Sequence, residues 1–393
     1  MDRSEIVALI DEAYIVRIRR QLHMYPELEF DLPNTLALVR SELAQLGIPF
    51  TEKYGRSSIV GYINPAHNGF TLGIRADMDA LPLQEKTGLP YASCIDGRMH
   101  ACGHDAHTAM LLGAAKALKT IEDRLPCRVL LVFQACEEGQ YTGAKLMVED
   151  GLMEEIDAIC GLHVETSMET GCIGACSGAA MATSHPIIIE FFGRTSHASK
   201  PQQGVDALAM AVRCYMDLQM LLAHERDPLA DECVLCIGSL HAGTTTNVTP
   251  DYAEIKISFR NFDMEFDERM LRRIRALAEH IALDAGGTAK VTDSIKAPVL
   301  YNDPQQCERL LASARKIVGA ENIRPVPRRI SSEDFAFYAQ KKPAGFFRLG
   351  IGNEAFGSTV GGHRNDFRVD EAALPTGSAV FVQFALDQPS TVS

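Results

Sequence analysis

The sequence has 393 residues, and at roughly 100–200 residues per domain this length predicts two domains. Apolar residues make up 46% and charged residues 23%, which is ordinary globular usage and excludes a wholly disordered chain. Lys and Arg number 38 against 51 Asp and Glu, a formal net charge of −13. This balance argues against a general nucleic-acid-binding protein, because such proteins need basic patches.

Nothing in the sequence signals a membrane or secretion. No run approaches the roughly 18 apolar residues that cross a bilayer. No hydrophobic secretory segment follows the charged residues 1–5. The 11 cysteines are an odd number in a long chain without such a signal, so we expect most of them to be reduced. These observations predict a soluble, cytoplasmic protein without a membrane partner.

The first part of the chain alternates predicted helices and strands. Apolar spacing predicts helices over residues 5–21, 36–46, 108–118 and 143–149, and strands over 58–63, 70–76, 128–135 and 158–164. Continuous apolar strands between helices are typical of a mostly parallel sheet covered on both faces, so we predict an α/β domain. The same pattern returns near the C-terminus, with helices over 305–318 and 371–386 and a strand over 345–349.

The middle of the chain has a different pattern. Strands are predicted over 186–192, 233–240, 252–259 and 289–291, and helices over 205–222 and 266–284. This βαββαβ order is that of a split ferredoxin-like unit. We predict that residues 1–182 and 294–393 form one discontinuous domain and that residues 183–293 are inserted in it. The strict alternation in 252–259 implies one exposed sheet face, and an exposed sheet edge could pair with a second copy.

Residues 99–107 hold the densest cluster of reactive side chains. It contains a thiol, three imidazoles and a carboxylate, from Cys102, His100, His104, His107 and Asp105. Thiolate and imidazole suit borderline metals such as Zn²⁺, and carboxylates also suit Mn²⁺. A helix-capping aspartate among solvated histidines is the alternative, but it accounts poorly for the whole cluster. The cluster therefore favours a metal site.

Two adjacent glutamates, Glu137 and Glu138, directly follow an apolar predicted strand. In a parallel sheet the carboxyl ends of the strands form the ligand crevice. Two carboxylates there repel each other, so one must be protonated or neutralised by a metal. Because consecutive side chains point in different directions, one glutamate can bind a metal while the other holds a water. His163, near the end of another strand, and His363, in a glycine-rich loop, are further candidates that carry little weight alone.

Other motifs make weaker cases. Cys233 and Cys236 have the spacing of half a zinc ribbon, but the second half is missing and both lie in a predicted strand. The absence of G-x-S-x-G argues against an α/β-hydrolase, and the absence of P-C-x-x-C argues against a zinc deaminase. Two other classes of function stay open as alternatives: a thiol redox protein based on the two cysteines, and a non-catalytic metal-binding or ligand-sensing protein.

Six motifs stand in a fixed order along the chain. They are RADMDALPLQ (75–84), MHACGHDAHTAMLLGAA (99–115), FQACEEG (133–139), GLHV (161–164), TNVTPDYAEIKISFR (246–260) and SSEDFAFY (331–338). Together they resemble the metal-dependent amidohydrolase branch of the aminoacylase/carboxypeptidase superfamily. That branch includes hippurate hydrolases, N-acyl-amino-acid amidohydrolases and plant auxin-conjugate hydrolases. The resemblance runs from about residue 22 to about residue 385.

The resemblance implies two divalent metal ions per subunit, Mn²⁺ or Zn²⁺, with Co²⁺ or Ni²⁺ also tolerated by a mixed ligand set. Cys102 matches the ligand that bridges the two metals. The other matched ligands are His104, Glu138, His163 and His363. Glu137 matches the general base, which takes a proton from a water molecule.

The resemblance also implies roles for residues of the insertion, which would be a lid and dimerisation domain beside the catalytic domain. His197 matches a histidine that reaches into the partner subunit's site, which requires an oligomer, most simply a homodimer. Asn247 matches an asparagine that contacts the substrate. Arg260 matches an arginine that holds the substrate carboxylate.

The activity implied is metal-dependent hydrolysis of the amide bond of an N-acyl-L-amino acid, hippurate-like, N-acetyl or otherwise, to a carboxylate and a free amino acid. Within the same chemistry, a carboxypeptidase or dipeptidase and an N-acetyl-diaminopimelate deacetylase are alternatives, because no motif reports the depth of the acyl pocket. The chain departs from the family at Ala135-Cys136, where Pro-Ala is usual, and at Asn365, where Pro is usual. The complete ligand set nevertheless predicts an active enzyme.

Overall fold

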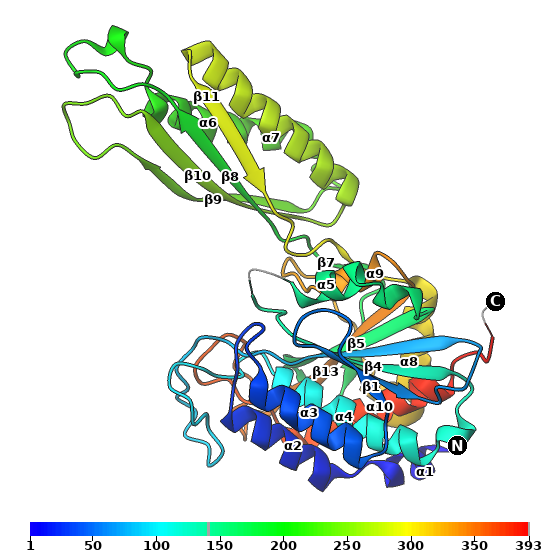
Figure 1. Cartoon of the computed structure of the whole chain (residues 1–393). Helices are drawn as coiled ribbons and strands as arrows, with labels where there is room; N and C mark the ends of the chain where they lie inside the picture. The colour runs from blue at the N-terminus through cyan, green and yellow to red at the C-terminus, as the bar shows by residue number, and fades with distance from the viewer. Residues whose placement is uncertain (140–141, 392–393) are drawn as a thin grey trace. The chain divides into compact units, whose positions relative to one another are not determined.

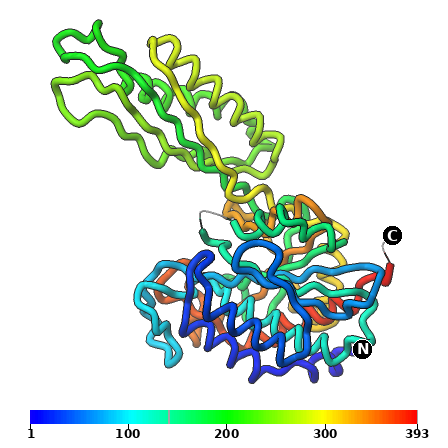
Figure 2. Tube along the Cα trace, in the orientation of Figure 1, coloured from blue at the N-terminus to red at the C-terminus, as the bar shows by residue number. Residues whose placement is uncertain are grey.

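The computed structural model describes residues 1–139 and 142–391, so the last two residues of the predicted range 294–393 and two residues of 1–182 lie outside the described residues. The chain forms two compact units. The first comprises Met1–Gly178, Tyr301–Arg328 and Asp334–Ser393, and the second comprises Ala179–Leu300 and Arg329–Glu333. The second unit is therefore inserted in the first, which the trace in Figure 2 leaves in the green part of the chain and re-enters in the yellow part.

A seven-stranded sheet, in the order β1-β2-β4-β3-β5-β13-β6, forms the centre of the first unit (Figure 1). Its strands are β1 (Phe50–Thr51), β2 (Ile59–Ile63), β3 (Thr71–Asp77), β4 (Arg128–Gln134), β5 (Ala158–Glu169), β6 (Ile173–Gly174) and β13 (Ala344–Gly352). β4, β3, β5 and β13 run parallel, and the pairings that involve β1, β2 or β6 are antiparallel. All of β3 is buried, including the charged side chains of Arg75 and Asp77. The predicted mixed α/β fold with a mostly parallel sheet is confirmed.

Helices cover both faces of this sheet. α4 packs on β2 to β5, and α2 and α10 both pack against α4. On this face Leu162 and Leu349 point at α10, whereas a Cβ at Gly161 would lie 3.1 Å from Phe335, just before α9, on the opposite face. The helices of this unit are α1 (Arg3–Leu9), α2 (Glu12–Met24), α3 (Pro33–Gln45), α4 (His104–Thr120), α5 (Gly143–Glu149), α8 (Pro304–Val318), α9 (Ala336–Ala339) and α10 (Leu374–Leu386).

An antiparallel four-stranded sheet and two helices form the second unit. Its elements are β8 (His185–Phe192), α6 (Ala207–Glu225), β9 (Cys233–Ala242), β10 (Tyr252–Asn261), α7 (Met264–Ala285) and β11 (Thr288–Asp293). The sheet order is β11-β8-β10-β9, so β9 is an edge strand. β10 alternates, and Ala253, Ile255, Ile257 and Phe259 lie in the core of this unit. β7 (Gly178–Met181) and β12 (Leu300–Asn302) form a separate two-stranded sheet.

The N-terminal segment differs from the single helix predicted over 5–21. It forms two helices, α1 and α2, because Asp11 leaves the helical conformation and its side chain accepts the Tyr14 backbone N–H at 3.0 Å. An aspartate in this place favours the cap of a new helix over the interior of an old one.

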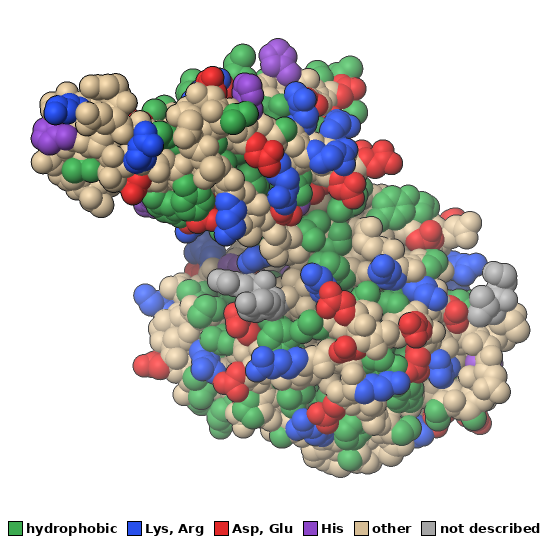
Figure 3. Space-filling model, turned by 45° about the horizontal axis from the view of Figure 1, so that its top comes forward, with side chains coloured by type: hydrophobic (Ala, Val, Ile, Leu, Met, Phe, Trp, Pro, Cys, Tyr) green, Lys and Arg blue, Asp and Glu red, His purple; other side chains and the backbone are tan. Residues whose placement is uncertain are grey.

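Two general surface properties bear on function. Within residues 1–139 and 142–391, no helix combines the length and the hydropathy needed to cross a bilayer. On the face shown in Figure 3, acidic and basic side chains are interspersed.

Candidate metal centre

Side chains from several segments meet at the carboxyl ends of the parallel strands of the first unit. The register pairs Asp77, the last residue of β3, with Gln134 of β4, and pairs Arg75 with Gly161 of β5. His163, two residues further along β5, and the Glu137-Glu138 pair after β4 are therefore level with the end of β3. This edge of a parallel sheet is where α/β folds bind ligands.

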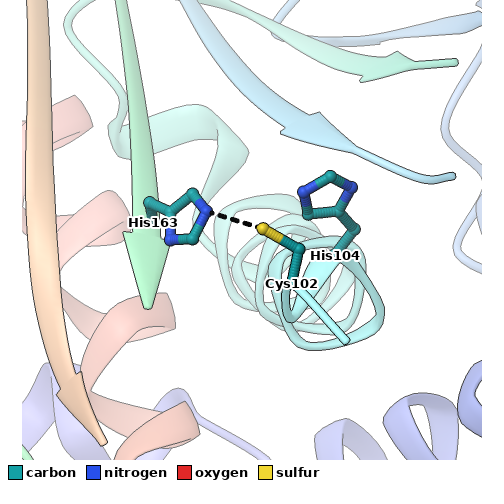
Figure 4. A group of neighbouring side chains, drawn as sticks. All are labelled: Cys102, His104 and His163. Carbon is teal, nitrogen blue, oxygen red and sulfur yellow. Dashed lines mark hydrogen bonds between the residues drawn. The ribbon is translucent and has the colours of Figure 1, made fainter. Parts of the chain in front are cut away.

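Cys102, His104 and His163 form the centre of the group (Figure 4). The ligand atoms of these three side chains all lie within 4.8 Å of one another. Cys102 Sγ lies 3.3 Å from His163 Nε2, the contact drawn as a dashed line in Figure 4. Gly103 makes the tight turn between Cys102 and α4: its φ is +93°, and a Cβ there would lie 2.5 Å from Val164.

The two imidazoles are each held by one ring nitrogen. Nδ1 of His104 donates to the Asp79 carbonyl oxygen at 2.9 Å, and Nδ1 of His163 donates to the Val164 carbonyl oxygen at 2.7 Å. In the neutral form of each ring, Nε2 is therefore the nitrogen without a proton. His104 Nε2 is buried without a hydrogen-bond partner among the described residues. A histidine ligand held through its other nitrogen is the usual arrangement at a metal.

The two glutamates are fixed by their backbones. Asp79 accepts the Glu137 N–H at 2.9 Å with one carboxylate oxygen and the Glu138 N–H at 3.1 Å with the other. Glu138 Oε1 lies 3.1 Å from His363 Nε2 and 4.0 Å from His104 Nε2. The structure thus brings Cys102, Glu138 and His363 within 4.8 Å of one another, and also His104, Glu137 and Glu138.

The His363 loop is anchored to the same group. The His363 N–H donates to the Ala101 carbonyl oxygen at 2.8 Å, and His363 has a left-handed φ of +61°. The carbonyl oxygen of Asn365 accepts the Lys86 N–H at 2.7 Å. The other departure from the family, Cys136, has a φ of +58°, immediately before Glu137. Both departures therefore lie next to residues of the centre.

The donor set fits divalent metal ions. Burial raises the pKa of the Cys102 thiol well above its ordinary value, and the Glu138 carboxylate raises it further. Burial alone would also raise the pKa of Glu138, but the hydrogen bond with His363 and the charge of His104 outweigh it, so this pKa is lowered. A cation among a thiolate, a carboxylate and an unpartnered imidazole nitrogen would compensate this arrangement. The residues present therefore suit such a group.

Of the three imidazoles in the 99–107 cluster, only His104 contributes to this group. His107 uses both ring nitrogens: Nδ1 lies 2.6 Å from Asp77 Oδ1, and Nε2 accepts the Val164 N–H at 3.0 Å. His100 is buried, and this burial lowers its pKa to about 3. The sequence interpretation missed the supporting residues Asp77 and Asp79. The signal was available, because two carboxylates at the end of a buried strand are as unusual as the Glu137-Glu138 pair.

The other three predicted site residues lie in the second unit. His197 and Asn247 are exposed and close together: His197 forms a bridge with Val248, and the Ala198 N–H donates to the Asn247 carbonyl oxygen at 3.0 Å. Arg260 lies near the opposite end of β10.

Comparisons with known proteins agree on one family. The sequence profile of peptidase family M20/M25/M40 matches residues 73–387. The chain belongs to peptidase family M20/M25/M40. The resemblance stated from the motifs is thereby confirmed.

Three relatives of this M20/M25/M40 chain span nearly its whole length. The chain is 36% identical over 377 residues to "IAA-amino acid hydrolase ILR1-like 4" of Arabidopsis thaliana, covering 95% of this chain and 85% of that protein. It is 36% identical over 366 residues to "N-acetyl-L-cysteine deacetylase" of Bacillus subtilis, covering 92% and 85%. It is 33% identical over 378 residues to "Thermostable carboxypeptidase 1" of Saccharolobus solfataricus, covering 95% of both.

A solved structure of the same family also resembles this chain. The Bacillus subtilis YXEP protein, described as a dinuclear metal binding peptidase from the M20 family, superimposes with a TM-score of 0.81 at 31% identity. The alignment covers 95% of this chain and 97% of that one.

Proposed function

We propose that this chain hydrolyses the amide bond of N-acyl-L-amino acids to a carboxylate and a free amino acid, with two divalent metal ions per subunit. The observation that carries the proposal is the partly buried group of thiol, imidazoles and carboxylate with a second glutamate beside it, in a member of family M20/M25/M40. Relatives named as an IAA-amino acid hydrolase and an N-acetyl-L-cysteine deacetylase support this substrate class.

Five residues would hold the metal ions. They are Cys102, as the ligand shared by both, and His104, Glu138, His163 and His363. When bound, such ions lower the pKa of a coordinated water and polarise the scissile carbonyl. Mixed sulfur, nitrogen and oxygen ligands accept Mn²⁺, Zn²⁺, Co²⁺ or Ni²⁺, and we propose Mn²⁺ or Zn²⁺.

Glu137 would act as the general base and acid. Its backbone N–H is held by Asp79, and its Oε1 accepts the Asp334 N–H at 3.4 Å, so the carboxylate is oriented from two sides. It would take the proton of the attacking water and return it to the departing amine. Such a role contributes roughly 10²–10⁴-fold to the rate.

His197, Asn247 and Arg260 would contact the substrate. His197 Nδ1 accepts hydrogen bonds from Ser199 N at 3.1 Å and Oγ at 2.8 Å, so the neutral ring carries its proton on Nε2 and can donate to a developing oxyanion. Arg260 donates from Nη1 to the Ile330 carbonyl oxygen at 3.3 Å and to Ser332 Oγ at 3.5 Å. Its other donors can hold a substrate carboxylate.

These three residues support a homodimer. β10 runs from Tyr252 to Arg260 over about 26 Å at roughly 3.3 Å per residue, and Asn247 precedes its start. One small substrate cannot touch both Asn247 and Arg260 of the same chain. We therefore propose that the His197 and Asn247 that contact one substrate come from a different subunit than the Arg260 that contacts it.

The second unit would be the lid and dimerisation domain, which we place at residues 183–293, in line with its ferredoxin-like element order. One side of α6 exposes five large apolar side chains, which are between 37% and 60% accessible: Leu208, Val212, Tyr215, Met216 and Met220. This stripe and the β9 edge are suited to contact a second copy. The catalytic domain would comprise residues 1–182 and 294–393, and we propose a cytoplasmic location.

The test is release of free amino acid from N-acetyl, N-benzoyl, N-lauroyl and indole-acetyl amino acids and from dipeptides. Chelated protein is assayed first and then again after Mn²⁺ or Zn²⁺ is restored. We expect metal-dependent release that is lost in Glu137→Ala, while the exposed control Glu149→Ala retains it. Faster cleavage of dipeptides than of every acyl conjugate would favour a carboxypeptidase or dipeptidase, for which the relative "Thermostable carboxypeptidase 1" is the supporting observation. Release by Glu137→Ala within tenfold of the parent would remove Glu137 from the mechanism.

A further inference from the structure

The buried guanidinium of Arg75 contacts residues next to the metal centre. The side chain of Arg75 on β3 is only 1% exposed, and it donates in three directions. Nε reaches Gln134 Oε1 at 2.9 Å, Nη1 reaches Asp77 Oδ2 at 2.6 Å, and Nη2 reaches Asp334 Oδ1 at 2.7 Å. Asp334 lies next to the proposed base Glu137, and Asp77 lies next to the ligand His104.

Asp334 connects this guanidinium to the base. Its carboxylate also accepts Gln134 Nε2 at 2.9 and 2.8 Å and the Ala144 N–H at 3.1 Å, so its side chain is fixed on several sides. Its own backbone N–H donates to Glu137 Oε1 at 3.4 Å. The position of the Asp334 backbone therefore bears directly on the orientation of the proposed base.

Asp77 connects the same guanidinium to the ligands. Its Oδ1 lies 2.6 Å from His107 Nδ1, and its Oδ2 lies 3.7 Å from His104 Nε2, the nitrogen without a hydrogen-bond partner among the described residues. His107 in turn accepts the N–H of Val164, the residue after the ligand His163. Asp77 therefore lies directly beside the ligand His104 and is linked to the ligand His163 through His107 and the Val164 N–H.

We infer that Arg75 is a positioning residue that couples the two halves of the site, holding Asp334 on the side of the base and Asp77 on the side of the metal ligands. The planar guanidinium is suited to this because it offers fixed donors in several directions at once. A lysine ammonium at the end of a flexible stem cannot reach three acceptors in that geometry. Burial alone would raise the pKa of Asp77, but Arg75 and the two histidines outweigh it and keep this pKa well below its ordinary value.

This coupling predicts three distinct patterns of loss. Asp334→Asn should lower kcat at least tenfold and leave the dissociation constant for metal within twofold. Asp77→Asn should weaken metal binding about 10–100-fold, the usual effect of losing a partner of a ligand. Arg75→Lys should both lower kcat and weaken metal binding, with KM little changed. The reason is that Arg75 holds Asp334 beside the base and Asp77 beside the metal ligands.

The matched control is Arg128→Lys. Arg128 lies on β4 at the other end of the same strand pair, where it donates to Thr71 Oγ1 at 3.1 Å and to the Glu155 carbonyl oxygen at 3.0 Å. The same exchange there should leave kcat and metal affinity within twofold of the parent. Metal affinity is measured by competition between the protein and a chromophoric chelator for Co²⁺ and for Zn²⁺, on protein shown to be folded by circular dichroism.

The inference is overturned if folded Arg75→Lys matches the Arg128→Lys control in both measurements, or if Asp334→Asn weakens metal binding as much as it lowers kcat. If Arg75→Lys does not fold, the two aspartate variants decide by themselves, because the inference requires their effects to differ. The measurement of kcat rests on the proposed function, whereas the measurement of Co²⁺ and Zn²⁺ affinity does not. A parent that binds metal but cleaves no substrate would refute the function and still test the role of Arg75.

Discussion

Each unit of the chain buries a histidine among carboxylates, but the two clusters differ in how the ring nitrogens are used. In the second unit, His185 places Nδ1 at 2.7 Å from Asp267 and Nε2 at 3.1 Å from Asp293. In the first unit, His104 and His163 each give Nδ1 to a backbone carbonyl oxygen, which leaves Nε2 facing the other potential ligands. Burial and nearby acid groups therefore do not distinguish the clusters, whereas the unused nitrogen does.

The same rule applies inside the first unit, where His107 resembles His185 more than it resembles its neighbour His104. Both of its nitrogens are engaged, by Asp77 and by the Val164 N–H. His185 faces a carboxylate on each side, so its ring carries two protons and a positive charge. Burial lowers its pKa, but Asp267 and Asp293 outweigh this and raise it. Carboxylates engage both ring nitrogens of His185, whereas Nε2 of His104 has no hydrogen-bond partner among the described residues.

The largest effect is expected from removing one of these Nε2 atoms. His163→Asn should reduce bound metal from two ions to one per chain and reduce turnover to below about 1% of the parent, since losing a ligand costs more than the roughly 10–100-fold of losing a ligand's partner. Metal content by elemental analysis and amino-acid release measure the two effects. The control is His67→Asn, a surface histidine whose Nε2 contacts the Ser390 carbonyl oxygen. Two bound ions in His163→Asn would contradict the rule.

A smaller loss is expected from Asp79, which positions the two glutamates of the metal centre. It accepts the N–H groups of both Glu137 and Glu138, so Asp79→Asn replaces one accepting oxygen by an amide group that repels a backbone N–H. We expect kcat to fall about 10–100-fold with an unchanged KM. Steady-state kinetics check this, with the exposed Asp123→Asn as the control. An unchanged kcat would show that the glutamates hold their places without Asp79.

Part of the site could be predicted from sequence because its residues lie close together in the chain. Cys102 and His104 share one short segment, and Glu137 and Glu138 are adjacent. The choice between His104 and His107 could not be predicted, since it depends on Asp77 and the Val164 N–H, which come from separate strands. Arg75 was likewise invisible, because its partner Asp334 lies 259 residues away.

The fold shows the same division between local and distant causes. The seven-residue strands β3 and β4 and the amphipathic helix α7 follow from their own sequence patterns, and they were predicted within a few residues. The two-residue strands β1 and β6 were not, because a pair such as Ile173 and Gly174 has no period and becomes a strand only by pairing with β13.

Arg260 extends the comparison from histidines to arginines. Arg75 is buried with three acceptors, whereas Arg260 is only half-buried and makes two long hydrogen bonds from Nη1. By the same reasoning, the guanidinium of Arg260 has donors left that can bind a substrate carboxylate. Arg260→Ala should raise KM for carboxylate-bearing substrates about 10–100-fold, since a hydrogen bond to a charged group contributes about 1.5–3 kcal/mol, and should leave kcat within a few-fold.

The matched control for this change is Arg272→Ala on the exposed side of α7, where the side chain is 70% accessible. A substrate whose carboxylate is replaced by an amide should lose most of the difference between parent and Arg260→Ala. A KM that does not change in Arg260→Ala would remove this residue from the site.

The smallest effect on turnover is expected from replacing His185 by glutamine. This change should instead lower the stability of the protein to an extent that depends on pH. Asp267 also pairs with Asn261, and Asp293 also pairs with Arg275. His185→Gln removes the ring that contacts both carboxylates, so a buried carboxylate loses one of its donors. The loss in the free energy of unfolding should be about 2 kcal/mol at pH 6.

Because the folded pKa of His185 is raised, its contribution is complete below the ordinary value of 6.5 and decreases as the pH rises through the folded pKa. Urea unfolding of parent, His185→Gln and the exposed control His280→Gln, followed by circular dichroism at pH 6 and pH 9, should therefore show a parent–variant difference that shrinks at pH 9. An equal difference at both pH values would mean that the ring is neutral, and that the two carboxylates do not make His185 the charged counterpart of His104.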